Sequence, residues 1–211
     1  MTLFSGENIT SVRNGRIIFE KLSFGLGAGE IMALTGPNGT GKTSLLRIMG
    51  GLLDYQDGAL SWHGKTINEA PPCHWLGAEN PLKPKLSLWD NMAFWYDCYH
   101  ASSAKADLPH DKEKHIIDAL ESMKIDHLKD TPVRYLSTGQ KRRANLTRLF
   151  LQERPLWLLD EPATGLDFDT KQTLIACLED HAKKGGIAVI ATHRPDLWHA
   201  GKNLDMMEYR A

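Results

Sequence analysis

The segment that decides the fold reads Gly36-Pro37-Asn38-Gly39-Thr40-Gly41-Lys42-Thr43. It fits the phosphate-binding pattern G-x-x-x-x-G-K-[ST], in which glycines let the backbone turn so that successive N–H groups point at one anion. In this pattern the ammonium of Lys42 reaches the β- and γ-phosphates, and the hydroxyl of Thr43 can bind Mg²⁺. The segment therefore predicts a binding site for a nucleoside triphosphate.

The residues on either side of the loop support this interpretation. Ile31-Met32-Ala33-Leu34 is a short apolar run, typical of a buried strand, and residues 44–49 have the pattern of a helix. Because that helix would begin at Ser44, its dipole and its first N–H groups would add to phosphate binding. We expect Gly36 to Thr43 and Ser44 to contact the nucleotide. A glycine-rich loop without a ligand is the alternative.

The composition limits the class of protein. The chain has 211 residues, 42% of them hydrophobic, which is enough for a substantial core. A formal net charge of -1 predicts no general attraction to nucleic acid. Its cysteines, Cys73, Cys98 and Cys177, lack C-x-x-C spacing, which argues against a disulfide framework or a zinc site. We find neither a signal peptide nor an apolar run of membrane-spanning length, so contact with a membrane is expected only through partner subunits.

The order of patterns predicts an α/β fold with three parts. Residues 2–35 read as antiparallel strands that lead into the phosphate-loop strand, with a turn at Asn14-Gly15, which indicates a β subdomain. Residues from about 85 to 140 are expected to form a helical subdomain, because residues 111–124 place Ile116, Ile117, Leu120 and Met123 on one helical face. We treat residues 1–211 as a single domain.

Two later apolar runs complete the predicted core. Residues 156–159 and 187–191 are continuous apolar runs, typical of parallel strands covered on both faces, and a helix is expected around residues 174–183. Together with the phosphate loop, these elements predict a P-loop NTPase core.

Two carboxylates follow the first of these runs. Asp160 and Glu161 lie at the C-terminal end of a predicted buried strand, where ligands of open α/β sheets bind. Asp160 is suited to hold Mg²⁺, and Glu161 is suited to orient and deprotonate an attacking water. The residues alone are equally consistent with a solvated loop, but the phosphate loop favours the functional interpretation.

A second anion site is predicted near the middle of the chain. The run Leu136-Ser137-Thr138-Gly139-Gln140 precedes an apolar-periodic segment, which predicts that Ser137 caps a helix whose first N–H groups are exposed. An ordinary capped helix with a basic turn is the alternative. The run L-S-x-G-Q, placed between the phosphate loop and Asp160-Glu161, resembles the signature sequence of ABC-transporter ATPases. The resemblance covers essentially the whole chain.

This resemblance implies further roles. Gly165-Leu166-Asp167 matches the D-loop of the family, and His193 matches the histidine that contacts the γ-phosphate. The family fold implies a head-to-tail homodimer in which ATP lies between Lys42 of one subunit and Ser137 and Gly139 of the other, so that hydrolysis depends on closure of the dimer. Gln140 and Asp167 are also expected to bind the nucleotide.

A narrower resemblance is carried by three segments. They are residues 136–149, residues 154–167 and Leu76-Gly-Ala-Glu-Asn-Pro-Leu-Lys83. These segments resemble the ATPase subunit of the bacterial cytochrome c maturation system, the haem exporter. The resemblance implies polytopic membrane subunits as partners, a peripheral location on the cytoplasmic face of the inner membrane, and use of ATP in haem delivery.

Other functions remain open from the sequence. They are an ABC ATPase of another small-substrate transporter, a soluble ABC ATPase that acts in translation or DNA maintenance, and an ATP-binding assembly module with incidental turnover. The chain has a single nucleotide motif and no large basic segment, which argues against the soluble switch.

Two positions depart from the family pattern. Glu79 stands where many ABC ATPases have a glutamine that senses Mg²⁺ and the γ-phosphate; a carboxylate can bind Mg²⁺ but repels phosphate oxygens. Arg13 stands where an aromatic ring usually stacks on adenine. The Arg13 guanidinium can stack on a base, and Phe19 is the alternative, as is an ordinary exposed arginine.

Two other features of the sequence have both a functional and a structural interpretation: an adjacent cysteine and histidine, and a concentration of tryptophans. Cys73 beside His74 suggests axial ligands for haem iron, but adjacent residues in a loop are more often simply exposed. Tryptophans are concentrated in one third of the chain, and we expect most of them in the core and one or two at a partner interface. They are Trp62, Trp75, Trp89 and Trp95.

Overall fold

The computed structural model describes residues 2–101 and 111–210, which divide into two units. The first unit consists of Met1–Ala78, Arg154–Pro162 and Ile175–Ala211, and the second of Glu79–Glu153 and Ala163–Leu174. The helical subdomain expected at residues 85–140 falls inside the second unit, and its residues 102–110 lie outside the described residues.

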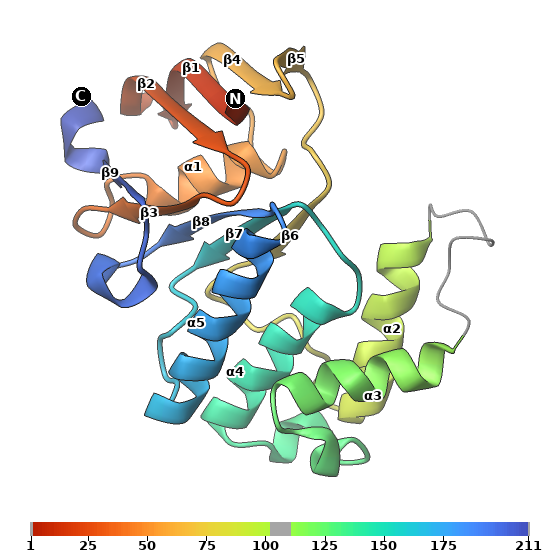
Figure 1. Ribbon diagram of the computed structural model, residues 1–211. Coiled ribbons are helices and arrows are strands. Elements are labelled where there is room, and N and C mark those ends of the chain that lie inside the picture. Colours follow the sequence, from red (N-terminus) through yellow and green to blue (C-terminus); the bar gives the residue numbers. More distant parts are fainter. Residues whose placement is uncertain (1, 102–110, 211) are drawn as a thin grey trace. The chain divides into compact units, whose positions relative to one another are not determined.

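The first unit contains an antiparallel sheet with the strand order β2-β1-β4-β5 (Figure 1). Its strands are β1 (Thr2–Arg13), β2 (Arg16–Gly27), β4 (Asp57–Trp62) and β5 (Lys65–Ile67). The turn expected at Asn14-Gly15 joins β1 to β2, and both residues have a positive φ, which suits a tight hairpin. The predicted antiparallel strands are therefore confirmed.

A parallel sheet with the order β6-β7-β8-β3-β9 forms the rest of the strand structure of this unit. Its strands are β3 (Ile31–Thr35), β6 (Cys73–Leu76), β7 (Leu156–Asp160), β8 (Ile187–Ala191) and β9 (Lys202–Asp205). Every residue of β7 and β8 is buried, as expected for parallel strands covered on both faces. The apolar runs predicted as strands are thus confirmed.

Helix α1 (Lys42–Met49) lies between the two sheets (Figure 1). Its buried residues Leu45, Leu46, Ile48 and Met49 join one hydrophobic core with residues of β1, β2, β7 and β8. The helix begins two residues before the predicted Ser44, because the carbonyl of Gly41 already accepts the first helical hydrogen bond, from the Leu45 N–H at 2.8 Å. This core fixes the start of α1, and with it the end of the phosphate loop.

Two short helices, η5 (Pro195–Trp198) and η6 (Met206–Tyr209), belong to the first unit. The longer helix α5 (Phe168–Lys183) is divided: its residues up to Leu174 belong to the second unit, and those from Ile175 onward belong to the first. Helix α5 begins earlier than the predicted residue 174.

The segment around Cys73 corrects one expectation. Cys73 and His74 are not in an exposed loop: they begin β6, and His74 is buried. The four tryptophans assigned mostly to the core are each half-buried, and Trp62 and Trp75 pack against the core of the first unit. The deeply buried tryptophans are instead Trp157 and Trp198.

The second unit is mainly helical. Its elements are α2 (Leu88–His100), α3 (Lys112–Ser122), α4 (Thr138–Thr147), η2 (Asp126–Leu128), η3 (Val133–Tyr135) and η4 (Arg148–Phe150). Ser87 and Asp111 cap α2 and α3 by accepting hydrogen bonds from backbone N–H groups of the first turn. On the expected apolar face of α3, Ile116 and Leu120 are buried, whereas Ile117 is half-buried. None of the helices in the described ranges is both long and apolar enough to span a bilayer.

A buried arginine joins the helices of this unit. The Arg148 guanidinium lies 3.7 Å from the centre of the Trp95 ring and donates hydrogen bonds to Asn145 Oδ1 at 2.9 Å and to the Tyr99 hydroxyl at 2.8 Å. Burial lowers the pKa of Arg148, and Tyr99 partly offsets that effect. The stacked guanidinium holds η4 against α2 through a planar contact that a lysine ammonium cannot reproduce.

We expect Arg148→Ala to destabilise the second unit by about 2–3 kcal/mol, because it removes the stack on Trp95 and leaves polar partners buried. Arg148→Lys should recover less than half of this loss. The measurement is chemical denaturation followed by tryptophan fluorescence. Lys114→Ala, in an exposed ion pair with Asp118, is the control and should leave the midpoint unchanged. An Arg148→Ala midpoint equal to that of the control would contradict the prediction.

Candidate functional site

The phosphate loop follows β3 and ends at α1. Gly36, Gly39 and Gly41 have φ values of 123°, 82° and 99°, in the region that favours glycine. At Gly41, a Cβ atom would lie 2.8 Å from both Ile18 Cγ2 and Phe19 Cδ1. The loop can therefore present a curve of backbone N–H groups only with glycine at these positions, and such a curve is an anion site at the start of a helix.

The side chain of Lys42 lies over this loop. Its Nζ donates to the carbonyl oxygens of Gly36 at 2.6 Å and Pro37 at 3.1 Å, and the residue is largely buried. The Thr40 hydroxyl donates to the same Pro37 carbonyl at 3.0 Å, which closes the turn. The ammonium is therefore held beside the concave side of the loop, where it can exchange these carbonyl oxygens for phosphate oxygens.

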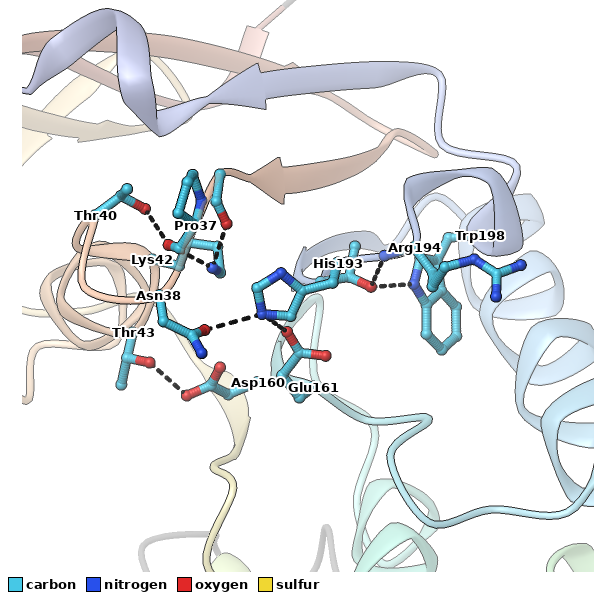
Figure 2. A network of polar contacts seen from close by, with 12 residues as sticks. Pro37, Asn38, Thr40, Lys42, Thr43, Asp160, Glu161, His193, Arg194 and Trp198 are labelled. Carbon is cyan, nitrogen blue, oxygen red and sulfur yellow. Dashed lines mark hydrogen bonds and ion pairs between the residues drawn. The ribbon is translucent and has the colours of Figure 1, made fainter.

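A hydrogen bond joins α1 to the end of β7. The Thr43 hydroxyl donates to Asp160 Oδ2 at 2.7 Å, across 117 positions of sequence (Figure 2). Within the described residues, no group of three or more His, Cys, Asp or Glu side chains could hold a metal ion. Two oxygen ligands from the protein suit an Mg²⁺ ion that takes its other ligands from phosphate and water.

Glu161 directly follows Asp160 and has an unusual backbone conformation. Its φ of 47° is in the left-handed region, and its N–H donates to the Ala191 carbonyl at 3.0 Å. Non-glycine residues seldom adopt this conformation, and where they do, they cluster at functional sites. Glu161 Oε1 lies 3.3 Å from His193 Nε2.

His193 lies at the start of the segment after β8. Its Nε2 is 3.0 Å from Asn38 Oδ1 in the phosphate loop (Figure 2). The preceding Thr192 is buried, and its hydroxyl accepts hydrogen bonds from the Arg194 N–H at 3.0 Å and from Trp198 Nε1 at 3.2 Å. These contacts fix the backbone on both sides of His193. The structure thus brings together Asn38, Lys42, Thr43, Asp160, Glu161 and His193.

Five further predicted site residues belong to the second unit: Glu79, Ser137, Gly139, Gln140 and Asp167. Ser137 caps α4, as predicted: its hydroxyl accepts from the Gln140 N–H at 3.2 Å, and Gln140 Oε1 accepts from the Ser137 N–H at 2.8 Å. This capping box occupies the Gln140 side chain. Gly139 lies beside Gly165, with 3.8 Å between an ideal Cβ and the Gly165 oxygen.

Asp167 and Glu79 lie in different surroundings within that unit. Asp167 Oδ1 accepts from the Thr170 N–H at 2.8 Å, and hydrogen bonds from the side chain and backbone of Thr170 lower the pKa of the Asp167 carboxyl. Glu79 is exposed in the segment before α2. The structure therefore gives Asp167 a defined capping position and Glu79 freedom to reorient.

The structure corrects one candidate for adenine stacking. Phe19 is fully buried against Gly41 and the core, so its ring cannot stack on a base. Arg13 is exposed at the end of β1, where it pairs with Arg16 of β2. Of the two residues, Arg13 therefore remains the candidate for stacking on adenine.

The haem-ligand alternative at Cys73 finds no support in the geometry. His74 is buried, and burial raises the pKa of the Cys73 thiol, which disfavours the thiolate that binds metal. Burial likewise raises the pKa of Cys177 to about 11. We assign both cysteines a packing role.

Sequence reasoning missed two contacts in the site: that of Asn38 with His193, and the anchoring of the His193 backbone by Thr192. Asn38 and His193 are 155 positions apart, so no local pattern links them. The one sequence feature that pointed to a role for Asn38 was its position inside the glycine-rich motif.

Comparisons with known proteins identify the family and the fold. A family model described as ABC transporter matches residues 19–164. The cytochrome c biogenesis ATP-binding export protein CcmA of Paramagnetospirillum magneticum is 40% identical over 195 residues, which are 90% of this chain and 87% of that protein. The protein of the same name from Rhodospirillum rubrum is 41% identical over 197 residues, covering 91% of this chain and 80% of that protein.

A solved structure of an ABC transporter ATP-binding protein from Pyrococcus furiosus is similar with a TM-score of 0.83. It is 24% identical, and the match covers 99% of each chain. At this identity the likeness concerns the fold, and it confirms the predicted α/β fold class.

We expect Gly41→Ala to weaken nucleotide binding at least tenfold and to lower stability by about 1–3 kcal/mol, because the new methyl group meets Ile18 and the fully buried Phe19. Calorimetric titration with ATP and chemical denaturation provide the measurements. Gly15→Ala is the matched control, since Gly15 also has a positive φ but nothing within 4 Å of its Cβ position. It should retain ATP affinity; equal loss in both variants would refute the packing argument.

Proposed function

This chain belongs to the ABC transporter family of ATP-binding proteins, and we propose that it hydrolyses ATP for an export step in cytochrome c biogenesis. The observation that carries the proposal is that three groups of functional residues lie at one edge of the parallel sheet. Lys42 lies on the phosphate loop, Thr43 bonds to Asp160, and Glu161 lies beside His193. The site thus offers an anion cradle, a magnesium position and a base.

The first task of the site is to bind MgATP. The backbone N–H groups of the loop and the Lys42 ammonium hold the β- and γ-phosphates. Thr43 and Asp160, whose oxygens are 2.7 Å apart, would hold the Mg²⁺ that accompanies ATP, and this ion would neutralise charge on the phosphate oxygens. Arg13 lies exposed on the β1–β2 hairpin, from which it can cover the base.

The second task is hydrolysis. Glu161 accepts a proton from a water whose oxygen forms the new bond to the γ-phosphorus, while the bond from that phosphorus to the bridging β–γ oxygen breaks. The products are ADP and phosphate. His193 donates a hydrogen bond from Nε2–H to a γ-phosphate oxygen, and this hydrogen bond stabilises the charge on that oxygen as the bond breaks. The 3.3 Å between Glu161 and His193 allows both groups to act on one phosphoryl group.

We propose that a second copy of the chain completes the site. Ser137, Gly139 and Gln140 begin α4, whose first turn carries no acidic residue to repel phosphate. Asp167, in the same unit, is the other residue that we assign to this contact. A nucleotide between two copies would link closure of the homodimer to hydrolysis, because each copy would then supply only part of the contacts to the γ-phosphate.

The names of the relatives give the cellular setting for the proposal. Proteins 40% and 41% identical to this chain are called export proteins of cytochrome c biogenesis. We propose polytopic membrane subunits of a haem exporter as partners, with this chain peripheral on the cytoplasmic face of the bacterial inner membrane and without a nucleic acid ligand. The ATP-dependent step would deliver haem or release a haem-loaded chaperone.

We expect Glu161→Gln to retain ATP binding but to lower kcat by about 10²–10⁴-fold and to abolish c-type cytochromes, because the amide cannot accept the proton from water. The measurement is ATP hydrolysis by the complex purified with its membrane subunits, with haem staining of cells. Lys42→Ala should lose ATP binding itself, and unaltered binding would refute the site assignment. Normal cytochrome levels in the Glu161→Gln strain would favour an assembly module.

Glu79 provides a separate test of the magnesium site. If its carboxylate binds Mg²⁺ once the nucleotide is present, Glu79→Gln should raise the Mg²⁺ concentration for half-maximal ATPase activity about fivefold, because an amide oxygen is a weaker ligand. Glu113→Gln, at an exposed position in the first turn of α3, is the control. Identical Mg²⁺ titrations of the two variants would remove Glu79 from the magnesium site.

A further inference from the structure

The contact between Asn38 and His193 is not explained by phosphate binding alone. Asn38 is exposed in the phosphate loop, and Figure 2 shows its side chain directed toward His193 rather than toward Lys42. His193 Nε2 lies 3.0 Å from Asn38 Oδ1 and 3.3 Å from Glu161 Oε1. One ring nitrogen therefore faces two side chains from two different strand ends.

The chemistry of these groups fixes the position of a hydrogen. An ionised Glu161 carboxylate can only accept, so it favours a hydrogen on His193 Nε2, although its contact with Nε2 at 3.3 Å is longer than the 3.0 Å hydrogen bond to Asn38. Asn38 must then present its carbonyl oxygen, because its NH₂ group would face another N–H. Within residues 2–101 and 111–210, Nδ1 of His193 has no hydrogen-bond partner that could set the tautomer instead. Asn38 and Glu161 together therefore select the Nε2–H form.

This tautomer is the one that the proposed reaction requires. Only Nε2–H can donate to a γ-phosphate oxygen from the present ring position; the other neutral tautomer would turn a lone pair toward two acceptors. The backbone of His193 is already anchored through Thr192, whose hydroxyl accepts from Arg194 and Trp198. These backbone contacts do not determine how the His193 imidazole is rotated or which of its nitrogens carries the hydrogen.

We propose that Asn38 is a positioning residue for His193. Its amide oxygen holds the imidazole as the Nε2–H tautomer, directed at the phosphate loop, until a γ-phosphate oxygen of bound ATP accepts that hydrogen in its place. This inference rests on the proposed ATPase function. ADP lacks the γ-phosphate, so the bond between Asn38 and His193 persists with ADP bound and is exchanged only when ATP is bound.

A direct role in phosphate binding makes different predictions. If Asn38 bound phosphate itself, its removal would weaken ATP and ADP alike and would do so without His193. If it acts through His193, its removal alters the histidine ring and the rate of hydrolysis, and has no further effect once His193 is gone. The two roles are separable by a double-mutant cycle.

The first measurement is the tautomer of His193 in the nucleotide-free full-length chain. Nitrogen-15 histidine spectra at about pH 8.5 observe neutral imidazoles, because the ordinary histidine pKa is about 6.5. His193→Gln assigns the signal. We expect the Nε2–H form in the wild type, and a mixture of tautomers in Asn38→Leu, which has a similar shape but no acceptor. His199, which contacts Glu179, is the internal reference and should not change. An unaltered His193 signal in Asn38→Leu would overturn the proposal.

The second measurement is ATP hydrolysis by the complex with its membrane subunits. Asn38→Leu should lower kcat about fivefold, the rate equivalent of one net hydrogen bond, while KM for ATP changes less than twofold. In a His193→Ala background it should have no further effect, and Asn38→Ser, which keeps a hydroxyl acceptor, should recover part of the rate. A loss of ATP and ADP affinity that persists without His193 would also overturn the proposal. Because Lys42→Ala tests nucleotide binding separately, failure here leaves the proposed function standing.

Discussion

The pairing of β8 with both β7 and β3 is the constraint on which the site depends. Ala191 at the end of β8 lies opposite Asp160 on one side and Leu34 on the other. Because the strands are parallel and in this register, their carboxyl ends meet at one edge of the sheet. The phosphate loop after β3, Glu161 after β7 and His193 after β8 must therefore emerge together. A shift of one residue in either pair would separate the base from the phosphate loop.

The strands that form this edge were also the most predictable part of the chain. Residues of β7 and β8 are buried on both faces, so they form continuous apolar runs with a single interpretation. The helix cap at Ser137 was predictable for a different reason, since a cap is a local hydrogen bond between near neighbours. In contrast, β5 and β9 are short, and their residues are exposed or half-buried, so they carry no periodic signal. The β6 strand is not predictable from its sequence, because it is only four residues long and begins with Cys73 and His74 directly after two prolines.

Within the site, the sequence identified residues through motifs but not through contacts. The glycine-rich pattern predicts Lys42 and Thr43, because their spacing from the glycines is fixed by the turn itself. It says nothing of Phe19, which the hairpin buries beneath Gly41 and thereby removes as an adenine contact. Nor does it indicate that Asn38 faces His193. Both facts depend on how strands far apart in sequence pair, which a single sequence does not encode in any local pattern.

The strained backbone at Glu161 explains how two adjacent carboxylates can serve one nucleotide. In a regular strand, successive side chains point to opposite faces, so Asp160 and Glu161 would diverge. With a φ of 47°, Glu161 leaves the strand conformation, and its N–H is held by the Ala191 carbonyl. Asp160 thus remains with Thr43 while Glu161 turns toward His193. The cost of this conformation, about 1–3 kcal/mol, is offset by the buried core of β7 and β8, which holds the strand ends in place. A relaxed turn would separate the magnesium position from the base, so the strain itself belongs to the architecture of the site.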